Sequence, residues 1–393
     1  MADAPDLVVQ GKLHCDEISG VRLELAGSLT PAWVALSEPV ATEDGSGHVV
    51  EMEPAPDDET LLVHAVLADS PHLATLVDCV SVQRKEVGTP SGGFEIQVLS
   101  PRYMVRGLHS AGNAQLFDAV RIRVTSLDSW ANLSGFGISP ADPDRSTLTY
   151  ERPPVNEATT ASGALISLHE SVSRSWPRAT GGHIHRKVWV ECKNFEAATY
   201  EDLQRRFVTP VVSFLSMLTG VRSPLTEVML RADERCVQVD SRNLLRSRST
   251  ADLRPDEILL PLSAATLEAV AKFVDVSEAT GPLPPVIADA HGYLSQSTLE
   301  TQVLELATVA EGLHRRLFEG EQRMTSANAD RLRGKLANAI SDEEQRLRDI
   351  IRGMLMHLEE MGYPKRLAAL AARVQVALPG ATGNTAKWVK AVV

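Results

Sequence analysis

"VRLELAGSL", residues 21–29, sets the pattern of the first part of this chain. Val21, Leu23 and Leu25 alternate with charged residues, and this period of two is typical of a strand with one buried face. Three later stretches repeat the alternation between clusters of Gly, Pro, Asp and Ser: "ATLVDCVSV" (74–82), "FEIQVL" (94–99) and "AVRIRVTSL" (119–127). Short strands joined by turn residues favour an antiparallel β-sandwich or barrel-like region over residues 1–150.

The next region, residues 151–255, mixes strand and helix patterns. "HRKVWVECK" (185–193) and "RCVQVD" (235–240) indicate strands. "TYEDLQRRFVTPVVSFLSMLTG" (199–220) has apolar residues at helical spacing, Thr199 as a candidate N-cap and Gly220 as a candidate stop. Pro210 lies inside this pattern and predicts a kink, because proline cannot donate the backbone hydrogen bond of a helix.

Residues 256–393 are predicted to be helical. The clearest stretch, "STLETQVLELATVAEGLHRRLFEG" (297–320), begins with a capping box from Ser297 to Glu300. Its apolar residues recur at spacings of three and four and predict one continuous buried stripe: Leu299, Val303, Leu306, Ala310, Leu313 and Leu317. Further helical patterns with short connections predict an antiparallel bundle. The whole chain is therefore expected to be an α+β multidomain protein.

Composition limits the possible functions. The 393 residues carry a formal net charge of −12, which argues against broad electrostatic attraction to nucleic acid or anionic lipid. Neither a membrane span nor a secretory signal is recognisable. The four cysteines contain no CxxC pair and predict free thiols in a cytoplasmic protein: Cys15, Cys79, Cys192 and Cys236.

Arg352 and His357 form an Arg-x4-His pair, which is the spacing of the active-site signature in one class of metal-independent ribonucleases. On a straight helix the two residues lie about 140° apart, so they do not form one cluster. Arg352 also faces away from the apolar stripe of its own helix. We therefore interpret the pair as a solvated helix face and a coincidence of spacing.

Other motifs give weaker signals. His183 and His185 share one face of a predicted strand, a geometry that metals use, but no third ligand can be named, so no metal site is predicted. "GTPSGG" (88–93) lacks the Gly-Lys-Ser/Thr ending of a phosphate loop, and no cofactor is expected. "EGLHRR" (311–316) joins Glu311 and Arg315 as an i,i+4 ion pair and leaves His314 at the margin of the apolar stripe. It is either a surface salt bridge beside a half-buried imidazole or part of a polar pocket.

The last pattern, "NTAKWVKAVV" (384–393), starts as a capped helix. It reaches Val393 after about two turns without a C-terminal cap, whereas helices usually run three turns or more. We therefore expect that the sequence is a piece of a longer protein in which this helix continues.

The order of these features resembles the ApeA-like proteins of bacterial anti-phage defence, which join an ApeA N-terminal domain to a HEPN helical domain. Five stretches carry the resemblance: "GVRLELAGSL" (20–29), "SLDSWANLSGF" (126–136), "VVSFLSMLTG" (211–220), "LELATVAEGLHRRLF" (304–318) and "AKWVKAVV" (386–393). The resemblance divides the chain into a β-rich half (1–150) and a mixed half (151–255) of the ApeA-like region, and an incomplete HEPN-like helical domain (256–393).

The resemblance implies a metal-independent endoribonuclease of abortive infection that cleaves tRNA or another cellular RNA. It implies a homodimer through the helical domain and a phage-derived trigger for the N-terminal region. The family's Arg-Asn-x3-His motif would follow "KWVKAVV", so its catalytic residues cannot be placed on any residue here. Glu311, His314 and Arg315 match the family's E-x-x-H-R helix and are expected to line or support the cleft.

Two other interpretations stay open. The chain could be a non-catalytic, dimeric binding protein that recognises a protein or glycan ligand. Alternatively, Arg352 and His357 could be the true catalytic pair, which would require RNA cleavage that is lost on His357→Ala.

Overall fold

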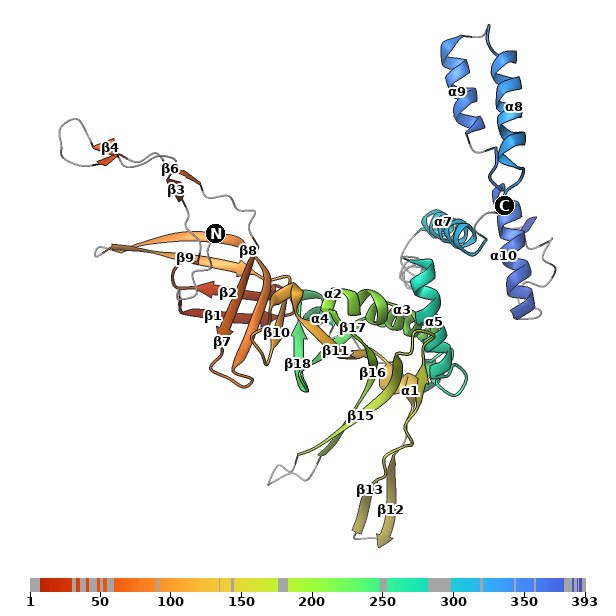
Figure 1. Ribbon diagram of the computed structural model, residues 1–393. Coiled ribbons are helices and arrows are strands. Elements are labelled where there is room, and N and C mark those ends of the chain that lie inside the picture. The colour runs from red at the N-terminus through yellow and green to blue at the C-terminus, as the bar shows by residue number, and fades with distance from the viewer. Residues whose placement is uncertain are drawn as a thin grey trace. The chain divides into compact units, whose positions relative to one another are not determined.

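The computed structural model describes two compact units, Met1–Asp275 and Val276–Val393 (Figure 1). The described residues are those outside 1–7, 30–32, 36–39, 42–47, 50–51, 55–59, 90–91, 134, 143–144, 176–182, 248–252, 282–297, 319–320, 343, 357, 378–383, 385–386, 388 and 391–393. A sheet-rich first unit followed by helices confirms the expected α+β multidomain class. The expected domain boundaries at residues 150 and 255 stay predictions.

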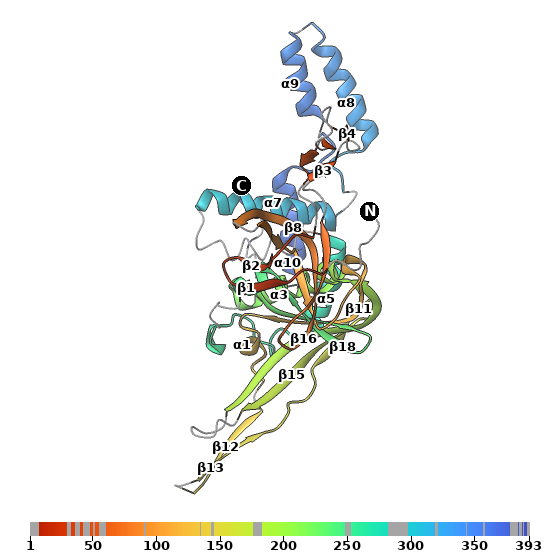
Figure 2. The same cartoon turned by 90° about the vertical axis from the view of Figure 1, so that its left-hand side faces the viewer.

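The first unit is built mainly from strands, seen from two sides in Figures 1 and 2. These are β1 (Gly11–Asp16), β2 (Gly20–Leu25), β3 (Trp33–Ala35), β4 (Val40–Ala41), β5 (His48–Val49), β6 (Met52–Pro54), β7 (Leu61–Val66), β8 (Leu73–Thr89), β9 (Gly92–Ser100), β10 (Tyr103–Arg106), β11 (Leu116–Val124), β12 (Phe136–Asp142), β13 (Arg145–Tyr150), β14 (Glu157–Thr159), β15 (Leu165–Ser175), β16 (His183–Thr199), β17 (Leu225–Ala232) and β18 (Arg235–Asp240).

Twelve of these strands form one antiparallel sheet in the order β1-β2-β9-β8-β10-β18-β17-β11-β16-β15-β14, with β7 paired to β8. The expected strand at residues 21–25 is β2, where Val21, Leu23 and Leu25 are buried while Arg22 and Glu24 are exposed. The two ends of the sheet are not paired with each other, so the described strands do not close into a barrel.

The first unit also contains helices: η1 (Gly112–Ala114), α1 (Leu127–Ala131), α2 (Tyr200–Leu203), η2 (Gln204–Val208), α3 (Thr209–Thr219), α4 (Arg242–Ser247), η3 (Pro255–Glu257) and most of α5 (Leu267–Thr280), whose last residues belong to the second unit. The main core lies between α1, α2, α3 and α5 and the inner sheet face, where Trp130 and Phe207 are among its largest buried side chains. A second core joins Leu245 of α4 to β2, β8, β9 and β10. Both cores belong to this unit.

The helical stretch at residues 199–220 forms with the predicted ends. Thr199 caps α2 by accepting a hydrogen bond from the Asp202 backbone N–H, and Gly220 ends α3 with φ of 76°. The backbone between them widens into a π-helical turn, η2, directly before Pro210. Proline has no N–H to bond the preceding turn, so it accounts for the predicted interruption.

The second unit contains α7 (Leu299–Leu317), α8 (Ser326–Ala339), α9 (Gln345–Leu355) and α10 (Tyr363–Ala377). The described helices pack as two pairs, α7 with α10 and α8 with α9. Thr298, rather than the expected Ser297, caps α7; Ser297 lies outside the described residues. Most of the predicted last helix, residues 386–393, also lies outside them.

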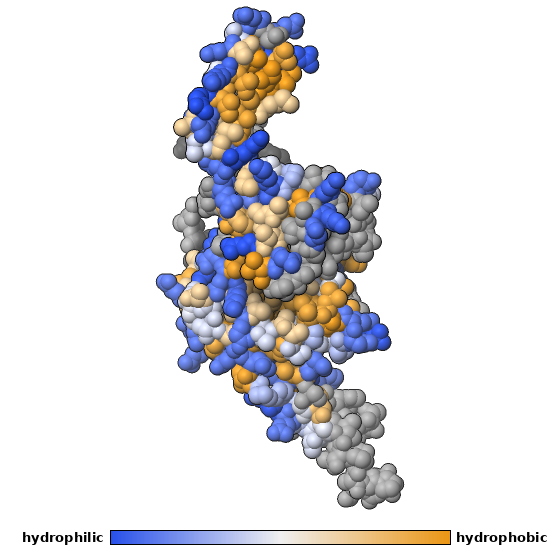
Figure 3. All heavy atoms as spheres, turned by 90° about the vertical axis from the view of Figure 1, so that its right-hand side faces the viewer, coloured by the Kyte–Doolittle hydropathy of each residue, from blue (hydrophilic) through white to orange (hydrophobic). Residues whose placement is uncertain are grey.

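The predicted apolar stripe of α7 is largely exposed in this unit. Val303 is 55% exposed, and Leu306 and Leu317 are nearly as open. The α8–α9 pair also leaves apolar side chains on its surface, which is the orange patch at the top of Figure 3: Leu332, Leu336, Leu347, Ile350 and Met354. The helix pattern was therefore predicted, but within this unit the described chain buries only part of it.

Candidate functional site

Glu311 and Arg315 lie on the same side of α7, as their i,i+4 spacing predicts. Arg315 Nη2 is 3.0 Å from Glu311 Oε1 and 2.8 Å from Glu360 Oε2 in the turn before α10. The expected ion pair therefore forms. The ion pair also belongs to a larger cluster, whose other members lie outside α7.

Arg366 of α10 completes that cluster. Its Nη1 is 2.7 Å from Glu311 Oε1, its Nη2 is 2.6 Å from Glu360 Oε2, and its Nε donates to the Met361 carbonyl at 2.7 Å. Arg366 is only 5% exposed. A planar guanidinium that bonds two carboxylates and a carbonyl fixes direction as well as charge, so Arg366 joins α7 to α10.

His314 lies beside this cluster and is only 3% exposed. Its ring stacks on Phe318 with centroids 4.8 Å apart and planes 17° apart. Burial, and then the positive charge of Arg366, lower the pKa of His314 below its ordinary value of 6.5, although Glu321 acts in the opposite direction. The imidazole is therefore mostly neutral at pH 7.

The Nε2 atom of His314 is buried and has no hydrogen-bond partner among the residues that the structure describes. Buried polar atoms nearly always have such a partner, so an unmet one calls for a physical explanation. His314 lines a pocket of about 230 Å³. The other residues that line it are Arg315, Phe318, Glu321, Gln322, Glu359, Glu360, Met361 and Arg366.

The charges of the pocket limit its chemistry. Arg315 and Arg366 are both paired with carboxylates, so neither guanidinium is free to hold a phosphate group. A neutral imidazole can accept a proton or a hydrogen bond, which suits a general base or a polar recognition group. The arrangement can orient and recognise a ligand, whereas an open anion site is disfavoured.

Arg352 takes no part in this cluster. The Arg352 side chain is 60% exposed, and its ion pair is with Asp349 of the same helix at 3.8 Å. His357 lies outside the described residues. The exposure of Arg352 agrees with the interpretation of this position as a solvated helix face.

Sequence reasoning did not find Glu360 and Arg366. Glu360 is 45 residues from Arg315, and Arg366 is 55 residues from Glu311, so no local spacing rule connects them. The only local signal is the pair of adjacent carboxylates in "LEEMG" (358–362) shortly before a new helix. The structure brings Glu311, His314 and Arg315 together with these two residues.

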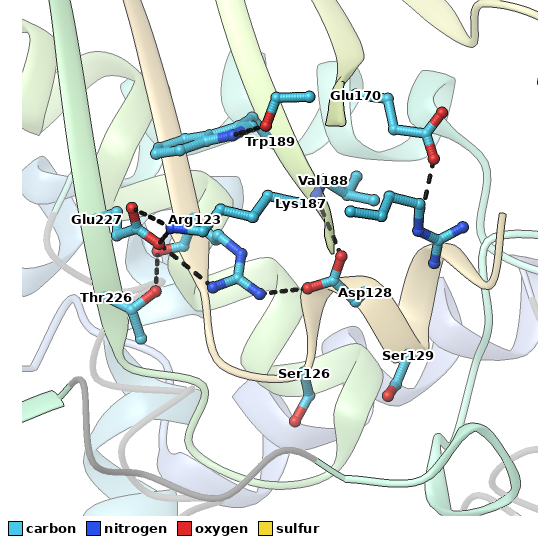
Figure 4. Close-up of polar contacts among 12 residues, drawn as sticks. Arg123, Ser126, Asp128, Ser129, Glu170, Lys187, Val188, Trp189, Thr226 and Glu227 are labelled. Carbon is cyan, nitrogen blue, oxygen red and sulfur yellow. Dashed lines mark hydrogen bonds and ion pairs between the residues drawn. The ribbon is translucent and has the colours of Figure 1, made fainter. Parts of the chain in front are cut away.

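A second polar cluster lies in the first unit, around the stretch "SLDSW" (126–130) (Figure 4). Arg123 of β11 lies between the carboxylates of Asp128 and Glu227 and is paired with both. Lys187 Nζ is 2.9 Å from Glu227, and the backbone N–H of Val188 donates to Asp128 at 3.1 Å. Two positive and two negative groups balance here, so this cluster ties α1 to the sheet rather than attracting a charged ligand.

The same stretch holds the segment that follows α4. The Ser126 hydroxyl accepts from the Leu253 backbone N–H at 2.9 Å, and the indole of Trp130 donates to the Leu260 carbonyl at 3.1 Å. Trp130 is fully buried. The quoted motif is thus a structural centre of the first unit.

The described residues provide no cluster for a metal ion, no disulfide and no membrane-spanning helix. Within the described part of the chain, no three His, Cys, Asp or Glu side chains come close enough to hold a metal ion. His185 is exposed near the start of the described part of its strand, and the side chain of His183 lies outside the described set. All four cysteines are free thiols, as expected. None of the described helices could span a membrane.

Comparison with known families identifies one match. The family model described as ApeA N-terminal domain 1 matches residues 1–261, about two thirds of the chain. No curated protein and no solved structure matches the sequence. The matched residues include three of the stretches that resemble ApeA-like proteins, namely residues 20–29, 126–136 and 211–220. The chain therefore belongs to the family of proteins with an ApeA N-terminal domain, a family of bacterial anti-phage defence.

Proposed function

We propose that this protein is a cytoplasmic abortive-infection factor whose helical unit is a HEPN-type, metal-independent endoribonuclease module. The observation that carries the proposal is the ApeA N-terminal domain over residues 1–261, followed by a separate helical unit. In this arrangement the first unit recognises a phage-derived trigger or holds the nuclease inactive, and the helices act on tRNA or another cellular RNA.

Cleavage without a metal requires a group that helps the ribose 2′-OH attack the neighbouring phosphate and a cation that stabilises the developing charge. The family's Arg-Asn-x3-His motif would supply both, and no stretch of this sequence matches that motif. Glu311, His314 and Arg315 are therefore proposed as positioning residues. The ion pairs of Glu311 with Arg366 and of Arg315 with Glu360 would hold the cleft wall in place.

The exposed apolar side chains of the helical unit support a homodimer through that unit. Soluble proteins rarely leave large contiguous apolar patches open, and such patches commonly mark protein interfaces. Light scattering would give the mass of the protein in solution, and Leu306→Glu on α7 should reduce it toward the monomer. A monomeric wild-type protein would contradict the dimer.

Phage challenge tests the proposed activity. Bacteria that express the complete protein should survive phage infection as a population and accumulate new RNA ends, which sequencing of 5′-hydroxyl termini would map. Arg366→Ala should abolish both effects because it releases Glu311 and Glu360. Arg352→Ala is the matched control, because its exposed side chain makes no contact with the cluster, and it should retain both effects. Protection without RNA cleavage would contradict the nuclease.

The second candidate is a non-catalytic, dimeric binding protein that recognises a protein or glycan ligand. The pairing of both pocket arginines with carboxylates favours it, because the carboxylates offset the positive charge that Arg315 and Arg366 would offer to a phosphate of RNA. The same infection experiment separates the two functions. Protection with intact RNA, together with a phage protein that co-purifies with the chain, would support this candidate.

A further inference from the structure

We propose that the pocket beside His314 is a nucleobase site, which recognises the exocyclic amino group of one unstacked base of the RNA. This inference rests on the proposed function, because it names what part of the RNA the helical unit recognises. It assigns specificity to the pocket and leaves the chemistry of cleavage to other residues.

A buried nitrogen of His314 lacks a hydrogen-bond partner among the described residues. Only 3% of the His314 surface is exposed, and the nitrogen without a partner among those residues is its Nε2 atom. An unpaired buried polar group is costly, and that cost disappears when a ligand supplies the hydrogen bond. Since the imidazole forms part of the pocket wall, a ligand that fills the pocket is the group best placed to do so.

The carboxylates of the pocket wall determine which kind of hydrogen bond the pocket offers to a ligand. Among the described residues, the Glu321 carboxylate makes no hydrogen bond or ion pair, while Glu359 and Glu360 also line the pocket. Ionised carboxylates only accept hydrogen bonds. The ligand must therefore present N–H donors, as the amino groups of guanine, cytosine and adenine do.

The charge of the pocket wall disfavours an anionic ligand. Three carboxylates face two guanidinium groups in the wall, and both guanidinium groups are already paired. A phosphate inside the pocket would meet excess negative charge, so the phosphates of the strand must stay outside. A neutral base can enter alone, which is how proteins usually read single-stranded RNA.

The shape of the pocket fits a planar ring. The ring of Phe318 stacks on His314, and the guanidinium of Arg373 lies 5.7 Å from the centre of the Phe318 ring. A planar base can stack on such a wall, and stacking on aromatic side chains is a common source of affinity for single strands. The pocket volume of about 230 Å³ accommodates a single base but not a base pair.

Guanosine and inosine provide the sharpest test, because they differ only in the exocyclic amino group. The complete protein would be titrated with fluorescent RNA ten-mers that carry one central guanosine or inosine in an otherwise uridine strand. We expect the guanosine strand to bind about tenfold more tightly, which is the selectivity that one recognised N–H donor gives. Glu321→Ala, which removes the acceptor, should lose this preference, and Glu305→Ala, on α7 and outside the pocket, should keep it. Adenosine and cytidine strands extend the comparison to the other amino-bearing bases.

A second variant separates loss of binding from loss of the folded structure. His314→Phe keeps an aromatic ring on Phe318 but removes the nitrogen, so it should weaken every amino-bearing strand while the melting temperature stays within a few degrees of wild type. Equal binding of all strands by the wild-type protein would overturn the proposal. Competition by agmatine but not by guanosine would also overturn it, because the site would then select a cation.

The outcomes distinguish this inference from the proposed function. Base preference in the binding assay without new RNA ends in infected cells would refute the ribonuclease and retain the base site. New RNA ends without base preference, either in binding or at the cleavage sites, would refute the base site alone. Free guanosine that binds as tightly as the strand would show that the ligand is a nucleoside rather than RNA.

Discussion

The two units of the molecule are stabilised in different ways. The first unit buries many large apolar side chains in two cores, including Trp130, Phe117, Phe207 and Leu76. In the described part of the helical unit, the buried apolar side chains are only Val309, Ala329, Leu367 and Ala371. The buried polar side chains His314 and Arg366 lie in that unit as well. The first unit is centred on hydrophobic cores. In the helical unit, the ion pairs of Arg366 stabilise the contact between α7 and α10.

This difference bears on how each unit responds to mutation. The first unit depends mainly on burial of apolar side chains for its stability. The described part of the helical unit has little internal core, and its geometry at the pocket depends on a few ion pairs. Small changes of charge should therefore alter the helical unit, while the first unit should respond mainly to loss of apolar volume.

The largest effect is expected from Trp130→Ala. This side chain is fully buried and its indole donates to the Leu260 carbonyl. Truncation of a buried aromatic residue costs about 3–5 kcal/mol of the free energy of unfolding. Urea unfolding, with hydrogen exchange mass spectrometry to resolve the two units, should show the loss in the first unit.

Leu116→Ala on β11 is the control for that experiment, because Leu116 is 50% exposed and its truncation should cost about 0.5 kcal/mol or less. An unchanged first unit in Trp130→Ala would contradict the view that "SLDSW" is its structural centre. Loss of exchange protection in α7 and α10 instead would contradict the separation of the two units.

Arg366→Ala should have the next largest effect, and it should be confined to the helical unit. The change removes three hydrogen bonds, including those to Glu311 and Glu360. The two carboxylates are partly exposed and can regain water, so we expect about 2 kcal/mol, less than for a fully buried pair. Hydrogen exchange should accelerate in α7 and α10, whereas Arg352→Ala should leave both helices unchanged.

The sequence predicted the helices and strands better than it predicted which residues pack against them. The alternation of Val21, Leu23 and Leu25 depends on neighbouring residues and correctly predicted β2 and its buried face. Thr199 and Gly220 act within one turn and correctly predicted both ends of their helical segment. The apolar stripe of α7 correctly predicted a helix, but whether Val303 and Leu306 are buried depends on what packs against them, which no local pattern contains.

The candidate site could be predicted only in part for the same reason. Glu311, His314 and Arg315 lie within one helical turn or so, and their grouping follows from helix geometry. Their partners Glu360 and Arg366 come from a distant turn and helix, so the closed cluster depends on how α7 packs against α10. Burial of His314, which controls its protonation, follows from the same packing.

The smallest expected effect is a pH dependence of the helical unit. The pKa of His314 is lowered in the folded protein, first by burial and then by Arg366. The unfolded chain therefore binds more protons than the folded chain in the window below the ordinary value of 6.5. Stability that is complete above this value is lost as the pH falls toward the folded pKa.

His314→Phe keeps the aromatic contact with Phe318 and cannot titrate, so its helical unit should lose less stability than wild type between pH 7.5 and pH 5.5. Exchange protection of α7 and α10, corrected for the intrinsic rate at each pH, measures the difference. The carboxylates around the pocket are present in both proteins, so their own titration largely cancels in the comparison. An equal loss of stability in both proteins would mean that water reaches His314 and that its pKa is not lowered by folding. An increase of wild-type stability in acid would mean that folding raises the pKa of His314.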